Sequence, residues 1–191
     1  MKKLILPICL LLTGVVSANG QSFSIGVRAG LNFANIIVSG PYSTTADSRT
    51  SFLLGGYTKF MFTDKMGLQP ELFYSSLGTK SSGFVQKLNY LSVPIMFRYN
   101  INGKLHFLVG PQLNILVAAK DISGGQTTDV KDAFNSTDFG GVLGVGVDFG
   151  PFNVGARYVA GFTNILKVHP SGYSEKNNVF QLVAGYKLFG K

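Results

Sequence analysis

The chain has one cysteine, two histidines and few charged residues, which make up 14% of its 191 positions. The cysteine, Cys9, lies in the apolar N-terminal stretch, so we expect it to leave with the signal peptide inferred below. A mature chain without cysteine offers no disulfide, thiol nucleophile or thiolate metal site. The histidines, His106 and His169, are far apart, and neither lies in an HExxH or Cys/His pattern. We therefore expect no metal site and no cofactor.

The sequence also lacks an apolar run as long as the ~20 residues that a membrane-spanning helix needs. Its one N-terminal apolar stretch, Leu4–Val16, is shorter, follows two lysines and precedes small residues. This arrangement is the pattern of a cleaved secretory signal peptide. Cleavage after Ala18 and cleavage after Gly20 both follow the small-x-small rule, and we favour Gly20. We divide the chain into a signal peptide, residues 1–20, and one domain, residues 21–191.

What the chain does contain is apolar and aromatic residues, at 46% and 13%, together with 24 glycines. An exported, weakly charged chain of this composition without a spanning helix is typical of a transmembrane β-barrel. The formal charge of +8 raises the question of nucleic-acid binding. Export and the scattered, single basic residues argue against nucleic acid. They favour anionic partners at a membrane surface, namely phospholipid and lipopolysaccharide.

Alternation of apolar and polar residues predicts eight strands. The expected strands are Ser22–Ala34, Phe52–Phe62, Gly67–Gly78, Lys87–Tyr99, Leu105–Ala118, Asp138–Phe149, Phe152–Phe162 and Asn178–Phe189. Long polar loops, at residues 36–51, 77–86, 120–137 and 163–177, alternate with short turns. Outer-membrane barrels have an even number of strands, short periplasmic turns and longer extracellular loops. The sequence therefore predicts an all-β fold, an eight-stranded antiparallel up-and-down transmembrane β-barrel.

The orientation of the strand faces distinguishes this barrel from a soluble eight-stranded barrel of the lipocalin type, which would place the apolar face inside. An eight-stranded interior is only just wide enough for packed side chains, so the large apolar set does not fit there. Aromatic residues also gather near both strand ends, as in the girdles of membrane barrels. We therefore assign the apolar face to lipid and the face rich in Gly, Ser, Asn and Gln to the lumen. We expect a bulge or locally broken strand pairing at Pro70, Pro94 and Pro111, since proline lacks the backbone donor.

The inward face carries the charged residues of the strands. The expected lumenal charge network comprises Arg28, Lys59, Glu71, Arg98, His106, Asp138, Asp148, Arg157 and Lys187. Buried charges persist only when they are paired and hydrogen-bonded. We therefore expect Glu71 at the centre of a network, contacting Lys59 and one or both of Arg28 and Arg98. An anion-selective constriction is the less favoured alternative, since eight-stranded barrels are normally filled with side chains.

The expected hairpin registers bring particular residues of this network together. A turn at Asp64–Met66 places Lys59 directly across from Glu71. The next short loop, read with its glycine in the left-handed position, places Arg98 across from His106. We therefore interpret Glu71 as an ion-pair partner and expect it to take part in no reaction.

Catalytic sites are poorly supported by the sequence, and we expect no enzyme. His169 with Ser171 or Ser174 and an acid is the best candidate for a Ser-His-acid triad. A solvated loop histidine is the favoured interpretation of His169. Three loop acids lack the spacing of a calcium-binding EF-hand and are interpreted as solubilising charges. These acids are Asp121, Asp129 and Asp132.

Several segments resemble the porin-family outer-membrane β-barrel domain of the Bacteroidetes type. They are GVRAGLNFANI, FTDKMGLQPELFYSSLG, LNYLSVPIMFRY, LVGPQLNILVAAK, DFGGVLGVGVDF, ARYVAGFTNI and VFQLVAGYKLF. The resemblance implies a barrel of the size of OmpA or OmpX in the Gram-negative outer membrane, with no shared reaction and no catalytic residues. Barrels of this kind commonly end on an aromatic residue recognised by the assembly machinery, whereas here Gly190 and Lys191 follow Phe189.

The expected function is that of an integral outer-membrane protein whose filled barrel is a structural scaffold. Its loops would make surface contacts, including contact with an extracellular ligand. A narrow porin-like channel, or a barrel component of a secretion or transport assembly, is the alternative.

Overall fold

The structure is a computed structural model that describes residues 22–39, 44–45, 48–81, 83–168 and 174–190. The expected signal peptide lies outside these residues, as do His169 and Ser171 of the candidate triad. Within the described residues, no helix has the length and apolar character needed to cross a membrane.

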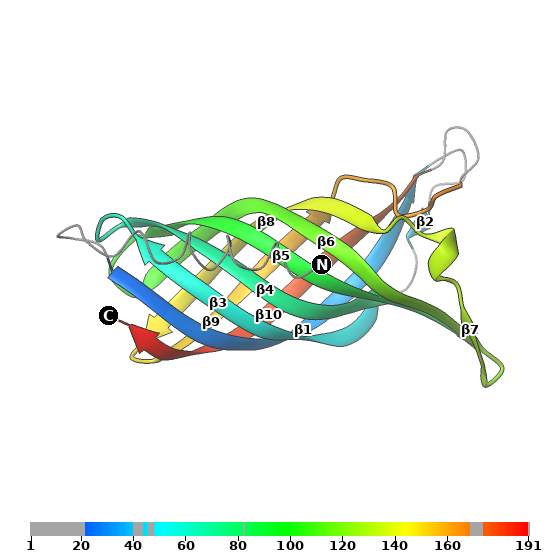
Figure 1. Cartoon of the computed structure of the whole chain (residues 1–191), viewed down its shortest axis with the longest axis horizontal. Coiled ribbons are helices and arrows are strands. Elements are labelled where there is room, and N and C mark those ends of the chain that lie inside the picture. Colours follow the sequence, from blue (N-terminus) through cyan, green and yellow to red (C-terminus); the bar gives the residue numbers. More distant parts are fainter. Residues whose placement is uncertain (1–21, 40–43, 46–47, 82, 169–173, 191) are drawn as a thin grey trace, which may run out of the picture.

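Eight strands form a closed antiparallel ring. They are β1 (Ser22–Ser39), β3 (Arg49–Met61), β4 (Met66–Ser81), β5 (Phe84–Asn100), β6 (Leu105–Ser123), β8 (Thr137–Phe149), β9 (Phe152–Gly161) and β10 (Ser174–Gly190). Each pairs with its neighbour in this order, and β10 pairs with β1 to close the ring (Figure 1). The remaining elements are β2 (Thr44–Thr45), which pairs with β1, β7 (Gln126–Asp129), which pairs with β6, and the 3-10 helix η1 (Lys131–Ala133). The predicted eight-stranded barrel is confirmed.

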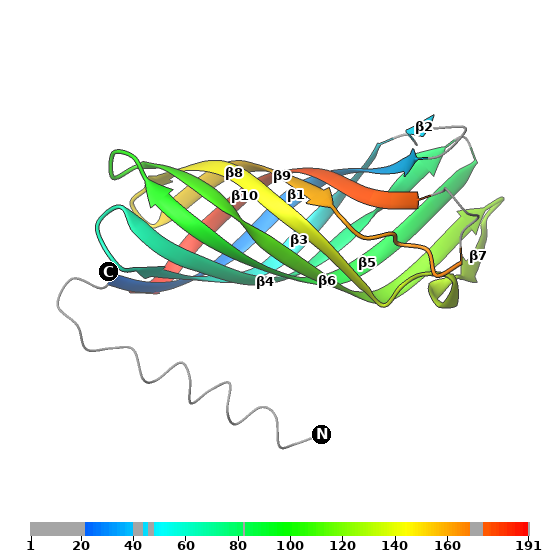
Figure 2. The ribbon, with the colours of Figure 1, turned by 90° about the horizontal axis from the view of Figure 1, so that it is seen from above.

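The two ends of the barrel differ in the length of their connections. Short turns join β3 to β4, β5 to β6 and β8 to β9 at the end where β1 begins and β10 finishes. Three longer connections, the two that contain β2 and β7 and the one between β9 and β10, lie at the opposite end, as Figure 2 shows from above. The connection between β4, which ends at Ser81, and β5, which begins at Phe84, lies at that end too and is short. We call these the short-turn end and the loop end.

The strands reach further toward the loop end than the sequence predicted. The expected loop at residues 77–86 is wrong, because β4 and β5 remain paired from Leu77 with Leu88 to Ser81 with Phe84. Likewise β10 begins at Ser174, inside the expected loop 163–177. Apolar and polar residues alternate only where one face of the strand meets an apolar medium. Backbone pairing continues beyond that medium, so the strands extend past the point where the alternation ends.

The exposed face of the barrel is apolar over its whole circumference, as predicted. Large hydrophobic side chains such as Val27, Leu72 and Leu143 are exposed on it. Aromatic rings gather near both ends. The ring centroids of Phe149 and Phe152 lie 6.1 Å apart near the short turns, and those of Phe52 and Tyr74 lie 6.2 Å apart near the loops. This face suits lipid with aromatic residues at both membrane interfaces.

The three strand prolines break the pairing locally, as expected. Pairing between β3 and β4 is interrupted at Pro70, pairing between β4 and β5 at Pro94, and pairing between β5 and β6 at Pro111. Pro70 lies opposite Ile95, so the interruptions follow one another across neighbouring strands. The wall of the barrel tolerates the missing donors as a local gap in the hydrogen-bond ladder.

Candidate functional site

The candidate site is the lumen, where the inward side chains of all eight strands meet. At its middle lies Glu71 of β4, whose carboxylate is buried and held by arginines from two other strands. Arg157 of β9 donates from Nη1 to Oε2 at 2.8 Å and from Nη2 to Oε1 at 2.7 Å. Arg28 of β1 donates to Oε1, and Gln69 Nε2 donates to the same oxygen at 2.7 Å. The three charged residues form a cross-lumen ion-pair layer, Arg28–Glu71–Arg157.

Neighbouring polar side chains extend this layer. The second Arg28 nitrogen, Nη2, donates to Asn153 Oδ1 at 2.6 Å, and Asn153 Nδ2 donates to the Tyr57 hydroxyl at 3.0 Å. The Arg28 guanidinium also lies 4.6 Å from the centroid of the Tyr57 ring, a cation–π contact. A Cβ built at Gly26 would lie 2.5 Å from that ring, so glycine leaves the space in which Tyr57 lies across the lumen.

A second cluster surrounds Asp148 of β8, nearer the short-turn end. Arg98 of β5 forms an ion pair with Asp148 Oδ2, and Lys59 Nζ lies 3.9 Å from the same oxygen. His106 Nδ1 lies 3.8 Å from Oδ1. Arg98 Nη1 also donates to Gln69 Oε1 at 2.9 Å, which connects this cluster to the Glu71 layer.

The expected contact between Lys59 and Glu71 is wrong. Tyr57 is the residue that pairs with Glu71, and Lys59 reaches Asp148 instead. The hairpin register differs because both Phe62 N and Thr63 N donate to Met66 O, which centres the turn before the expected position.

The expected pairing of Arg98 with His106 is also wrong. Arg98 pairs with Leu108, because the turn includes Lys104 and closes through a hydrogen bond from Ile101 N to Leu105 O. Of the two arginines expected at Glu71, Arg28 contacts it, and Arg98 contacts Gln69 and Asp148 instead.

Asp138 lies apart from both clusters, whereas Lys187 lies beside the Asp148 cluster. Asp138, near the loop end, accepts hydrogen bonds from Thr163 Oγ1 at 2.6 Å and from Asn177 Nδ2 at 3.2 Å. It forms no ion pair with any described residue. Lys187 lines a cavity at the short-turn end together with Lys59. The predicted network is therefore divided along the barrel axis, and Arg157 replaces Lys59 at Glu71.

An apolar cluster fills the lumen at the loop end. Its buried members include Leu77, Leu88, Tyr90, Leu116, Phe134 and Ile165. Phe134 comes from the connection between β6 and β8, and Ile165 from the connection between β9 and β10. The two connections are joined by hydrogen bonds from Asn135 N to Ile165 O at 2.8 Å and from Lys167 N to Ala133 O at 3.0 Å. We call Phe134 and Ile165, with the side chains they cover, the apolar plug.

The lumenal groups that the structure brings together are ion-paired and hydrogen-bonded side chains, which suit binding and structural roles. In the part of the chain that the structure describes, no three His, Cys, Asp or Glu side chains gather where they could hold a metal ion. The acid nearest His106 is Asp148, which is engaged by Arg98. Asp129 accepts a hydrogen bond from Lys131 N at 3.0 Å and is exposed, in keeping with a solubilising loop charge.

Comparison with known proteins identifies the family and supports the fold. Residues 18–167 match the family model described as outer membrane protein beta-barrel domain. No curated protein matches the sequence. Among solved structures, Neisserial surface protein A (NspA) aligns with a TM-score of 0.61 at 15% identity over 89% of this chain and 100% of that one.

Two further solved structures also align. Ail, the attachment invasion locus protein of Yersinia pestis, aligns at 20% identity and a TM-score of 0.49 over 90% of this chain and 100% of that one. The outer membrane protein OprG of Pseudomonas aeruginosa aligns at 15% identity and a TM-score of 0.45 over 88% and 97%. The NspA likeness bears on the fold alone, and none of the comparisons assigns this chain to the Bacteroidetes.

Proposed function

The chain belongs to the outer membrane protein β-barrel domain family and lies in the Gram-negative outer membrane, and on that premise we propose that it is a non-conducting surface scaffold. Its barrel anchors the chain in the membrane, and its loop end, on the extracellular side, makes contact with partners. We further propose that the chain catalyses no reaction and that the outer-membrane assembly machinery inserts it.

The observation that carries this proposal is that side chains obstruct the lumen at two levels. The Arg28–Glu71–Arg157 layer crosses its middle, and the buried side chains of the apolar plug fill its loop end. An ion crossing this lumen would have to separate a buried ion pair and then pass an apolar obstruction, and both steps are unfavourable. The obstruction supports a scaffold over a narrow channel.

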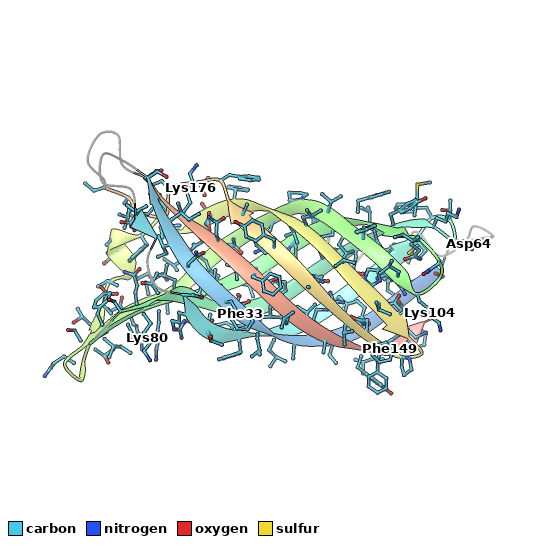
Figure 3. The ribbon with its side chains drawn as sticks, turned by 180° about the vertical axis from the view of Figure 1, so that it is seen from behind. Phe33, Asp64, Lys80, Lys104, Phe149 and Lys176 are labelled. Atoms are coloured by element: carbon cyan, nitrogen blue, oxygen red, sulfur yellow. The ribbon has the colours of Figure 1, made fainter. Side chains whose placement is uncertain are left out.

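The loop end offers charge for an anionic partner. Lys87 of β5 lies directly opposite Lys120 of β6, and like charges in this position destabilise a strand pair. Asp129 of β7 lies opposite Lys120 on its other side, so two ammonium groups share one neighbouring carboxylate. Lys80 is exposed at the same end, as Figure 3 shows. Phosphate groups of lipopolysaccharide would reduce this repulsion, so we propose lipopolysaccharide as a contact of the extracellular hairpins, beside phospholipid around the barrel. A ligand at the cell surface would use the same hairpins.

Conductance across planar lipid bilayers tests the scaffold proposal. We expect the purified, folded chain to insert without producing discrete current steps, because the lumen is filled. Heat-modifiable gel migration verifies that the sample is folded, and a general porin inserted in the same bilayers verifies detection. Reproducible anion-selective steps from the folded chain would refute the proposal and establish the narrow channel.

A further inference from the structure

The mouth of the barrel at the short-turn end contains a polar cavity of about 350 Å³ that the scaffold proposal does not use. Its charged and polar lining consists of Tyr57, Lys59, Lys104, Asp148, Asn153 and Lys187. These residues come from β3, β8, β9, β10 and the turn between β5 and β6. Figure 3 shows Lys104 and Phe149, both part of this mouth, at the end opposite Lys80 and Lys176.

The cavity has more cationic than anionic groups. Three lysines line it, and Asp148 is its one lining carboxylate. That carboxylate is already engaged by Arg98 and Lys59. Lys104 and Lys187 form no ion pair with any described carboxylate. Lysines that line one partly enclosed space repel one another unless an anion joins them.

The charges deeper in the lumen increase this imbalance. Glu71 is shared between Arg28 and Arg157, so the ion-pair layer itself retains one positive charge. The Tyr57 hydroxyl accepts from Asn153 Nδ2, which leaves its own proton free to be donated into the cavity. The mouth thus combines ammonium groups, a phenolic donor and a positive background.

We propose that this cavity is a binding site for a phosphate group on the periplasmic side. Lysine ammonium groups bind phosphate as point charges, and a dianion offsets the lysines that lack a carboxylate partner. Two sources share this chemistry. One is a soluble phosphate or phosphate ester, and the other is the headgroup of an inner-leaflet phospholipid whose chains lie against the exposed rings of Phe149 and Phe152.

Nuclear magnetic resonance of the ¹⁵N-labelled full mature chain tests the site. In uncharged detergent micelles, inorganic phosphate is titrated against chloride at constant ionic strength. We expect saturable shifts at the amides of Gly103, Gly150 and Asn153 with phosphate and not with chloride. A second arm uses nanodiscs of phosphatidylglycerol, where a headgroup in the cavity gives proton–phosphorus contacts to the same residues.

Matched variants locate the effect. Combining Lys104→Gln with Lys187→Gln should weaken phosphate binding about tenfold or more, since a charge-assisted hydrogen bond is removed at each position. Combining Lys131→Gln with Lys167→Gln removes the same charge from two exposed loop-end positions that belong to neither proposed binding surface, and it should leave binding unchanged. The charge-preserving pair Lys104→Arg and Lys187→Arg should retain binding even if the glutamine pair fails to fold.

The outcomes distinguish the two sources of phosphate and also test whether the site exists. Saturation in micelles identifies a soluble phosphate site, and contacts seen only in nanodiscs identify a lipid headgroup. Absence of both signals, or equal binding by the folded glutamine pair, overturns the proposal. The phosphate titration and the nanodisc measurement do not depend on conductance or on contacts at the loop end, so this inference can fail while the scaffold proposal stands.

Discussion

At the scale of single residues, Glu71 is the side chain on which the middle of the lumen depends. It is the acceptor for two guanidinium groups whose strands, β1 and β9, are separated from each other by β10. Both arginine side chains are themselves buried at 2% exposure, so neither can turn to water if the carboxylate is lost. The Arg28–Glu71–Arg157 layer is therefore a structural requirement of this lumen, and removing the acid leaves two buried cations without a counter-ion.

Glu71→Gln should destabilise the folded barrel by about 3–5 kcal/mol, the typical penalty for removing one partner of a buried ion pair. The measurement is the urea midpoint of heat-modifiable gel migration in lipid vesicles, because the chain has no tryptophan for fluorescence. Asp129→Asn removes the same charge from an exposed loop-end position and should leave the midpoint unchanged. Equal midpoints for the two variants would contradict the structural role of Glu71.

At the scale of elements, the strands could be predicted from sequence and their ends and registers could not. Alternation identifies every ring strand because lipid and lumen impose different chemistry on successive residues. It fails at the start of β10, where Glu175, Lys176 and Asn177 are all polar and pairing with β1 maintains the strand. Alternation also gives no information on where a turn is centred, which is why the predicted register pairs Lys59, and not Tyr57, with Glu71.

The contact between Arg157 and Glu71 illustrates a second limit of the sequence. Both residues were expected to face the lumen, and both do. Their meeting depends on closure of the ring, which brings β4 and β9 to opposite sides of one narrow interior. Local patterns report which face a residue occupies, and the diameter and stagger of the closed barrel decide which inward residues touch.

The apolar plug makes a prediction about the two loop-end connections that form it. Phe134→Ala should release them, because truncating a buried phenylalanine costs about 3–5 kcal/mol of stability. That loss exceeds the free energy that commonly opposes local opening of loop connections. We expect faster protease cleavage between residues 124 and 136 while the ring keeps its heat-modifiable migration. Val168→Ala lies in one of the same connections at an exposed position and serves as the control. Unchanged cleavage after Phe134→Ala would show that the plug does not hold the loops.

At the scale of the whole molecule, the barrel is divided along its axis. At the short-turn end the lumen carries Lys59, Arg98 and Lys187 with one engaged carboxylate, and at the loop end the apolar plug fills it beside the buried Asp138. The lipid face has no such division, since exposed hydrophobic residues extend between both aromatic girdles. The molecule therefore presents different chemistry to the two compartments, and its orientation decides which compartment meets the lysine cavity.

Single-cysteine labelling tests that orientation directly. The sequence has one cysteine, which lies in the expected signal peptide, so an introduced cysteine in the mature chain has no background. Asp132→Cys, in the exposed connection after β7, should react with a membrane-impermeant maleimide on intact cells. Asp64→Cys, exposed in the short turn between β3 and β4, should react only after the outer membrane is permeabilised. The reverse pattern would place the lysine cavity outside the cell, where the loop end is expected, and would overturn the assignment of each mouth to its compartment.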